Sequence, residues 1–231
     1  MPAEALERLG QDLWVATRPL PLWAGDVGTR MTVIRLRSGD LFLHSPVSLD
    51  PALREALDRI GRVRWVVGPS RVHHFYLGDY LRAYPEAELC GAPGLAEKRP
   101  DLRFQHVIGD APVPAWSDEL QHLVFAGAPR LNEVVFLHRA SRTLLFTDLA
   151  FNVQPGPGNR ARILHWLLGA TGRFGPHRLV RSMIRDREAA RRSLATILSW
   201  DFERVIVTHG EVLERGGPAA VRAGFAYLGP L

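Results

Sequence analysis

The chain has 231 residues, of which 46% are hydrophobic, and a formal charge of +5 at pH 7. This length and apolar content suffice for a large buried core, and no Ser/Gly-rich linker divides the chain, so we expect a single domain spanning residues 1–231. The one cysteine excludes an internal disulfide and a thiolate cluster, so a metal would need His, Asp or Glu ligands.

The basic charge is almost entirely arginine, because Lys98 is the only lysine. The densest group of arginines, between Arg181 and Arg192, also contains acidic residues, which indicates a solvated helix face rather than a nucleic-acid-binding stripe. The N-terminus lacks a signal-peptide pattern, and no apolar run approaches the roughly 20 residues of a membrane span. We therefore expect a cytoplasmic protein with a small-molecule substrate or ligand as its partner, neither nucleic acid nor membrane, and a homodimer is left open.

Hydrophobic patterning predicts the elements in chain order. Strands are expected where apolar residues alternate or run together, at residues 13–16, 31–36, 41–44, 63–67, 88–91, 120–125, 133–138, 143–146 and 205–207. Helices are expected where apolar residues recur at helical spacing, at residues 49–60, 77–84, 94–98, 163–168, 187–200 and 217–228. Strands lead and helices follow in each half of the chain, which favours an α/β fold built as a four-layer αββα sandwich.

Three of the predicted strands lead into loops that carry a histidine or an acid. His73 and His74 follow the strand at 63–67, Asp148 follows the strand at 143–146, and His209 follows the strand at 205–207. Active sites of layered α/β proteins collect at such strand ends. Two imidazoles and one carboxylate suit one zinc ion with an open position, or iron(II), and His74 could be a fourth ligand or a general base.

In this order, the segments resemble the metallo-β-lactamase superfamily, and most of all its branch named domain of unknown function 4336. Residues 70–78 stand where the superfamily has Thr-His-x-His-x-Asp-His-x-Gly, and His73 matches the second histidine. Asp148 matches the metal-bridging aspartate and His209 the last histidine. Four other ligand positions of the superfamily carry different residues here, namely Arg71, Phe75, Tyr76 and Ala128.

The resemblance implies a hydrolase with a reduced, at most mononuclear metal site, acting on a small anionic ester, thioester or lactone. The metal ligands would be His73, His74, Asp148 and His209. The catalytic residues would be His74, Asp148 and Tyr76. The substrate would be bound by Arg71, Arg130 and Asn132, and Glu133 could also line the pocket.

The lost ligands leave an alternative open, a non-catalytic binding protein that kept the fold and the pocket but not the metal. The permanent charge of Arg71 opposes a nearby divalent ion, so the sequence favours one zinc or iron(II) ion no more than it favours none. Whether the chain is an enzyme is therefore also left open.

Overall fold

The computed structural model describes residues 5–22, 25–26, 28–154 and 172–230, which divide between two compact units. The first unit is formed by Met1–Arg18 and Arg30–Ile108, and the second by Pro19–Thr29 and Gly109–Leu231. The segment 19–29 therefore belongs to the second unit although both of its flanks belong to the first. The helix predicted at 163–168 lies outside the described residues, and the single domain stays a prediction.

The strands described in the first unit form one sheet in the order β1-β2-β5-β6-β7-β8-β9. Their bounds are β1 Glu7–Gly10, β2 Leu13–Arg18, β5 Thr29–Arg35, β6 Asp40–His44, β7 Arg62–Gly68, β8 Glu88–Gly91 and β9 His106–Val107. Strands β6 to β9 run parallel, whereas β1 pairs β2 and β5 pairs β6 in antiparallel fashion. Parallel strands bring their carboxyl ends to one edge of the sheet.

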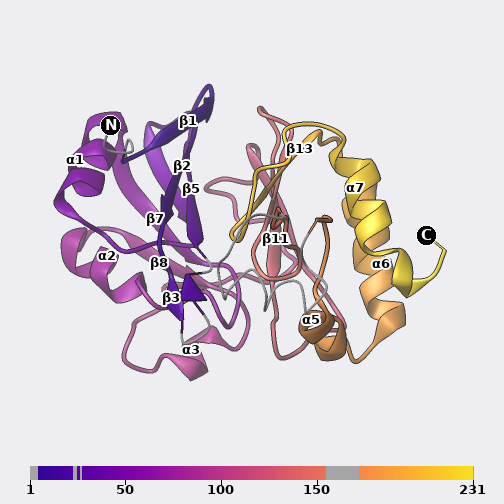
Figure 1. Cartoon of the computed structure of the whole chain (residues 1–231). Coiled ribbons are helices and arrows are strands. Elements are labelled where there is room, and N and C mark those ends of the chain that lie inside the picture. The colour runs from indigo at the N-terminus through magenta and orange to yellow at the C-terminus, as the bar shows by residue number, and fades with distance from the viewer. Residues whose placement is uncertain (1–4, 23–24, 27, 155–171, 231) are drawn as a thin grey trace. The chain divides into compact units, whose positions relative to one another are not determined.

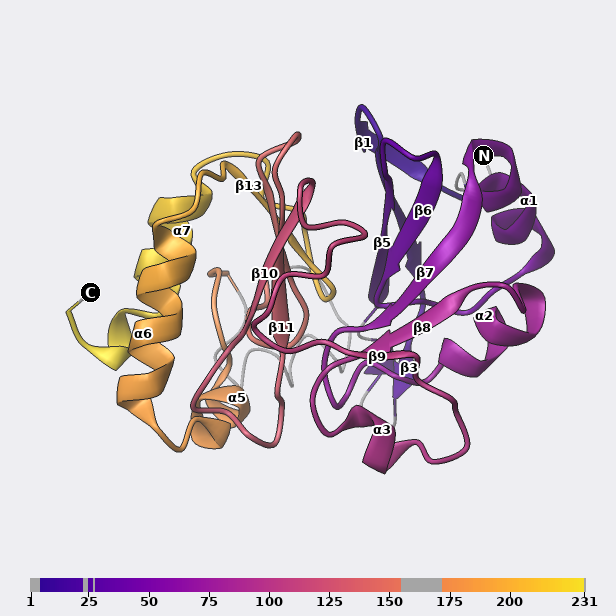
Figure 2. The same cartoon turned by 180° about the vertical axis from the view of Figure 1, so that it is seen from behind.

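Two helices of the first unit pack on β7 and cover one face of its sheet (Figures 1 and 2). They are α1 Pro51–Ile60 and α2 Leu77–Ala83, and a short helix, α3 Leu95–Lys98, follows β8. Helix α1 begins where the sequence predicts, because Asp50 accepts a hydrogen bond from the Leu53 amide at 2.8 Å. Leu53 and Leu57 on its inner side are fully buried in the core that this helix shares with the sheet.

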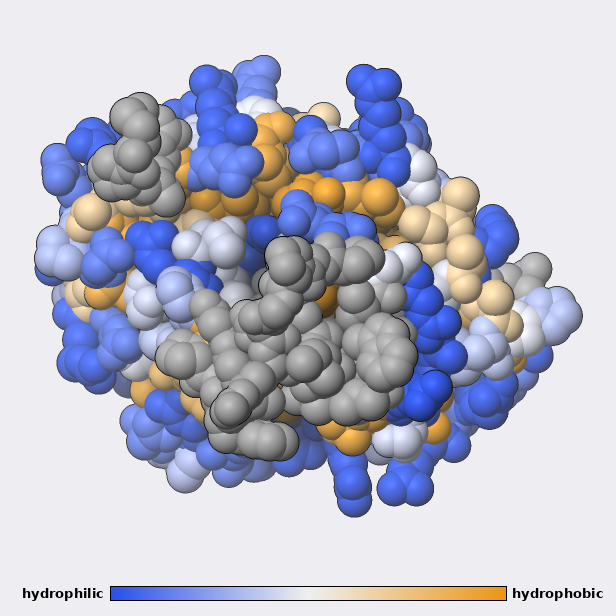
Figure 3. Space-filling model, in the orientation of Figure 1, coloured by the Kyte–Doolittle hydropathy of each residue, from blue (hydrophilic) through white to orange (hydrophobic). Residues whose placement is uncertain are grey.

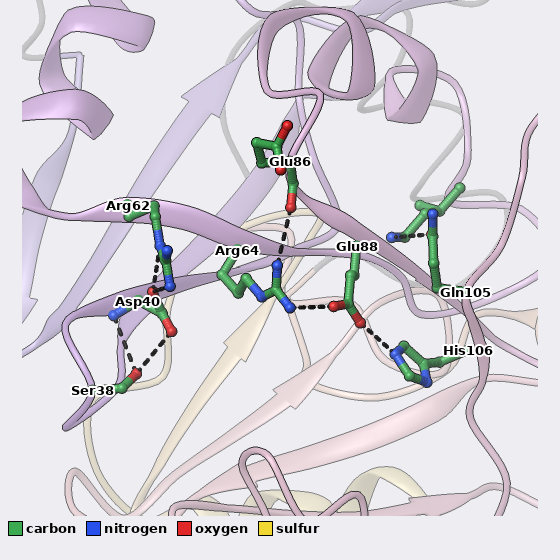
Figure 4. A network of polar contacts seen from close by, with 9 residues as sticks. Ser38, Asp40, Arg62, Arg64, Glu86, Glu88, Gln105 and His106 are labelled. Carbon is green, nitrogen blue, oxygen red and sulfur yellow. Dashed lines mark hydrogen bonds and ion pairs between the residues drawn. The ribbon is translucent and has the colours of Figure 1, made fainter.

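A polar network links neighbouring parallel strands of the first unit (Figure 4). Glu88 of β8 accepts from Arg64 of β7 and lies 2.6 Å from Nε2 of His106 on β9. Asp40 of β6 pairs with Arg62 of β7 at 2.8 Å. These charged side chains pair across neighbouring strands, so they help to fix the register of the sheet.

The strands described in the second unit form a sheet in the order β10-β11-β12-β13 and a small β3-β4 ribbon. Their bounds are β3 Pro21–Leu22, β4 Gly25–Asp26, β10 Leu120–Val124, β11 Val134–His138, β12 Thr143–Phe146 and β13 Arg204–Val207. The first three strands of the sheet are antiparallel, and β13 pairs β12 in parallel.

Two longer helices of the second unit cover one face of its sheet, as both views in Figures 1 and 2 show. The helices of this unit are α5 Arg178–Met183, α6 Arg187–Leu198 and α7 Gly217–Gly224, and the 3-10 turn η1 Ala226–Leu228 follows. Phe225 joins the helices to the sheet, because its ring lies 6.1 Å from that of Phe125 and 6.2 Å from that of Phe146.

The helices turn their polar sides outward, and hydrophilic side chains are prominent on the face shown in Figure 3. In helix α6, for example, Ala190, Leu194 and Ile197 are buried, whereas Glu188 and Arg192 are exposed. Within the described part of the chain, no helix is long and apolar enough to cross a membrane.

Candidate functional site

Asp148 and His209 each follow one of two neighbouring strands in the sheet of the second unit. In the parallel pairing of β12 with β13, Phe146 stands opposite Val207, and each predicted site residue follows its strand by two positions. As a result, Nε2 of His209 lies 3.6 Å from Oδ1 of Asp148. The register of two short strands thus brings together two side chains that are far apart in the sequence, as the strand-end pattern predicts.

A hydrogen bond determines which nitrogen of His209 faces Asp148. Nδ1 of His209 lies 2.6 Å from the carbonyl oxygen of Gly28, which belongs to the same unit. A carbonyl can only accept, so Nδ1 carries the proton and the neutral ring presents the lone pair of Nε2 to the carboxylate of Asp148. With Nε2 deprotonated, an imidazole nitrogen and a carboxylate oxygen face each other, which are donor types that zinc and iron(II) accept, whereas a proton on Nε2 makes the two side chains an ion pair.

The buried carboxylate of Glu133 holds the loop that carries Asp148. Oε2 of Glu133 accepts from the amides of Asp148 at 2.8 Å and Leu149 at 2.9 Å, and Oε1 accepts from the amide of Thr147 at 2.6 Å. Burial and the charge of Asp148 raise the pKa of Glu133 to about 7, although the bonds from Thr147 and Leu149 act in the opposite direction. Glu133 therefore orients Asp148 through the backbone, and its place in the lining of a pocket stays a prediction.

The ring of His209 is also fixed by its surroundings. The ring of Phe151 stacks on it at 5.5 Å, with an interplanar angle of 11°. The next residue, Gly210, has φ of 102°, and a Cβ added there would lie 2.3 Å from the carbonyl oxygen of Asn152. Only glycine fits this close approach, which directs the chain away from the sheet directly after the histidine.

His73 lies in the first unit, on the loop after β7. The Ser70 hydroxyl accepts from the amide of His73 at 3.2 Å, and Nδ1 of His73 lies 2.8 Å from the hydroxyl of Ser45. Ser45 follows β6, the parallel neighbour of β7, so two adjacent strand ends hold this imidazole. With Nδ1 engaged by a hydroxyl, Nε2 is the nitrogen suited to ligation.

His74 is held by a different contact. Nη1 of Arg99 donates to the carbonyl oxygen of His74 at 2.7 Å and lies 3.3 Å from its Nδ1. Because arginine can only donate, this arrangement places the proton of the neutral ring on Nε2. Burial, followed by the charges of Lys98 and Arg99, lowers the pKa of His74 to about 4. A ligand or general-base role for His74 stays a prediction, and it requires that the contact with Arg99 be broken.

The remaining predicted site residues are distributed between the units. In the first unit, Lys98 Nζ donates to the carbonyl oxygen of Arg71 at 2.6 Å, and Tyr76 packs against the hydrophobic core. In the second unit, Arg130 is exposed, and Asn132 is half-buried with φ of 43°. Their roles in catalysis and substrate binding stay predictions.

The buried His44, at the end of β6, makes stability depend on pH. Burial, and secondarily the charge of His73, lowers its pKa from 6.5 to about 3. Below pH 6.5 this histidine is protonated in the unfolded chain but stays neutral in the folded chain. The free energy of unfolding should therefore fall by up to about 1.4 kcal/mol for each pH unit between about 6.5 and about 3. Urea denaturation of metal-free protein at pH 7.5, 6 and 5 should show this loss, and a His44→Gln variant should lose less. Equal slopes in the two proteins would contradict the assignment.

Comparison with solved structures establishes the class of fold. A metallo-β-lactamase from Hirschia baltica matches with a TM-score of 0.64 at 14% identity, with 96% of both chains covered. One from Erythrobacter litoralis matches with a TM-score of 0.68 at 12% identity, with 98% of both chains covered. The mono-zinc form of FIM-1 from Pseudomonas aeruginosa matches with a TM-score of 0.66 at 12% identity, covering 97% of this chain and 96% of that one. The predicted α/β, metallo-β-lactamase-like fold class is confirmed.

The family follows from the sequence itself. The model of the domain of unknown function DUF4336 matches residues 11–167, and the chain belongs to this family. No curated protein matches the sequence. The resemblance predicted from the strand-end residues is therefore confirmed, and at this level of identity the solved structures establish the fold alone.

Three residues that support the candidate ligands were missed or misread in the sequence. Gly28 and Ser45 act through hydrogen bonds to His209 and His73, and no sequence pattern singles out either of them. Glu133 carried a usable signal, because an acid directly before an almost wholly apolar strand is expected to have buried donors as partners.

Proposed function

We propose that the chain is a hydrolase of the metallo-β-lactamase fold that uses one metal ion, held by His73, Asp148 and His209. The proposed substrate is a small anionic ester, thioester or lactone, and the proposed location is the cytoplasm. The observation that carries the proposal is the pairing of Asp148 with His209, in which Oδ1 and Nε2 lie 3.6 Å apart while Nδ1 of the imidazole is engaged by the carbonyl of Gly28.

The proposed site residues have different roles. Asp148 and His209 are oriented before any ligand arrives, by Glu133 and Gly28, which lowers the cost of assembling a site. The proposal adds His73 from the loop after β7, whose Nδ1 is occupied by Ser45. A bound zinc or iron(II) ion would supply Lewis acidity towards water and substrate. Arg71, Arg130 and Asn132 are proposed to bind the anionic group of the substrate.

Hydrolysis assays test this function directly. Purified protein should hydrolyse at least one member of a panel of anionic aryl esters, thioesters and lactones, lose that activity on chelation, and regain it with zinc or iron(II). The His209→Ala variant should be inactive under all conditions, whereas a His122→Ala variant, altered at a half-buried histidine bonded to the Gly109 carbonyl, should keep the activity. Activity that survives chelation and persists in His209→Ala would overturn the proposal.

The metal-free binding protein is the second candidate, and two observations favour it. Ala128, at a position where the resemblance implies a metal histidine, is buried, and Nδ1 of His74 faces an arginine donor. Thermal-shift measurements separate the two candidates. Stabilisation by divalent metals that disappears in His73→Ala and His209→Ala supports the hydrolase, and stabilisation by organic anions alone supports the binding protein.

A further inference from the structure

A cavity of about 360 Å³ lies in the second unit, where the segment before α5 packs against α7. Its lining combines two arginines with an aromatic ring and small helical residues, namely Arg173, Phe174, Arg181, Ala220, Ala223 and Gly224. This volume falls within the range of small-molecule pockets. None of these residues is a candidate metal ligand.

Arg181 is held in place at the cavity wall. Its Nε donates to the carbonyl oxygen of Pro176 at 3.1 Å, and its guanidinium lies over the ring of Tyr227 at 4.4 Å from the centroid. These two contacts occupy the Nε edge and one face of the guanidinium group. Among the residues that the structure describes, the Nη groups have no hydrogen-bond partner, so a preorganised two-pronged donor remains for a ligand.

The charges around Arg181 are of one sign. Burial lowers the pKa of Arg181, and the neighbouring charges of Arg173 and Arg178 lower it further. Among the described groups that shift this pKa there is no carboxylate, and the tyrosine of the cation–π contact acts in the opposite direction. The two guanidinium groups that line the cavity, those of Arg173 and Arg181, repel each other, and an anion of two charges between them would reduce that repulsion.

The rest of the lining is apolar and tightly built. Ala220, Ala223 and Gly224 share one side of α7. This side lies so close to the segment before α5 that a Cβ at Gly224 would be 2.8 Å from the carbonyl oxygen of Phe174. The ring of Phe174 in turn lies 6.4 Å from that of Phe146 in the core of the unit. The small residues leave space, and the aromatic ring provides an apolar surface inside it.

We propose that this cavity binds a small phosphate monoester, with the phosphate on Arg181 and Arg173 and the apolar group against Phe174 and α7. The guanidinium fork matches the geometry of phosphate oxygens, and the apolar lining distinguishes a monoester from inorganic phosphate. This ligand is separate from the substrate proposed above, and the proposal does not depend on a metal.

Calorimetric titration of the full chain in the presence of a chelator tests this binding without interference from the metal site. Phenyl phosphate should bind, and inorganic phosphate should bind more weakly because it makes no apolar contact. Arg181→Met should weaken phenyl phosphate binding at least tenfold while keeping the side-chain stem on Tyr227. Ala223→Leu, at an exposed position of α7, should fill the cavity and weaken phenyl phosphate more than inorganic phosphate.

Matched variants make the outcome decisive. Arg222→Met removes the same charge from an exposed position of α7 outside the lining and should leave binding unchanged. Arg173 is also exposed, and Arg173→Met should weaken phenyl phosphate binding. This variant tests the proposal if Arg181→Met fails to fold. No binding of phenyl phosphate at millimolar concentration, or equal losses in Arg173→Met and Arg222→Met, would overturn the assignment. Either result would leave the proposed hydrolase function untouched, since that function is tested with metal and His209→Ala.

Discussion

Replacing Glu133 by alanine should cause the largest loss of stability among single substitutions near the candidate site. The carboxylate accepts three backbone amides from residues 147–149, and its side chain is fully buried. Each amide left without an acceptor costs about 1–3 kcal/mol, so the loss of all three should lower the free energy of unfolding by roughly 3–9 kcal/mol in urea denaturation. Such a loss is a large fraction of the stability of a typical domain.

Glu133→Gln separates the geometry of Glu133 from its charge. Glutamine keeps one acceptor oxygen, which can serve either the Thr147 amide or the pair at Asp148 and Leu149, so the stability of this variant should lie between those of the alanine variant and the unaltered protein. Glu203→Ala is the matched control, because Glu203 accepts a single exposed amide, that of Gly216. If Glu133→Ala and Glu203→Ala lose equal stability, Glu133 does not hold the loop.

Metal content should depend on Asp148 and His209. After growth with zinc and iron, protein purified without a histidine tag should carry about one metal ion per chain by mass spectrometry, as expected for three ligands. His209→Ala and Asp148→Ala should each lower metal affinity by more than the roughly 10–100-fold that follows loss of a supporting hydrogen bond. A competing chromophoric chelator measures this affinity.

The control for metal content must remove an imidazole without removing a proposed ligand. His122→Ala meets this need, because Nε2 of His122 lies 3.0 Å from the carbonyl oxygen of Gly109. This variant should retain the full metal content. A metal content near zero in the unaltered protein, or an unchanged content in His209→Ala, would rule out the proposed metal site and favour the metal-free binding protein.

Most of the described helices and strands could be predicted because hydrophobic spacing and helix caps are properties of short stretches of sequence. The helix expected at 49–60 is α1 Pro51–Ile60, with Asp50 capping it, and the strand expected at 63–67 is β7 Arg62–Gly68. Strands β1, β3, β4 and β9 and helix α5 escaped prediction. Strands β3, β4 and β9 have only two residues each, and β1 is exposed along half its length, which leaves no apolar alternation to detect. Strand β1 pairs with β2, the next strand along the chain, and β9 pairs with β8 across the segment that contains α3.

The candidate site was predictable at the level of side-chain type and strand position, but not at the level of contacts. Asp148 and His209 were identified because each follows an apolar strand, and the parallel register of β12 and β13 then brings them together. The contact of Arg99 with His74 could not be anticipated, since it depends on where the short helix α3 ends in space. Long-range hydrogen bonds of this kind leave no periodic trace in a sequence.

The bond between His209 and Gly28 has a consequence for how the protein matures. It joins residues 181 positions apart, and it is the contact that sets the tautomer of a proposed ligand. During synthesis, the segment 19–29 emerges early and cannot make this bond until the last strand of its unit has been translated. Closing such a long loop is intrinsically slow, so competence to take up metal should arise late, after most of the secondary structure has formed.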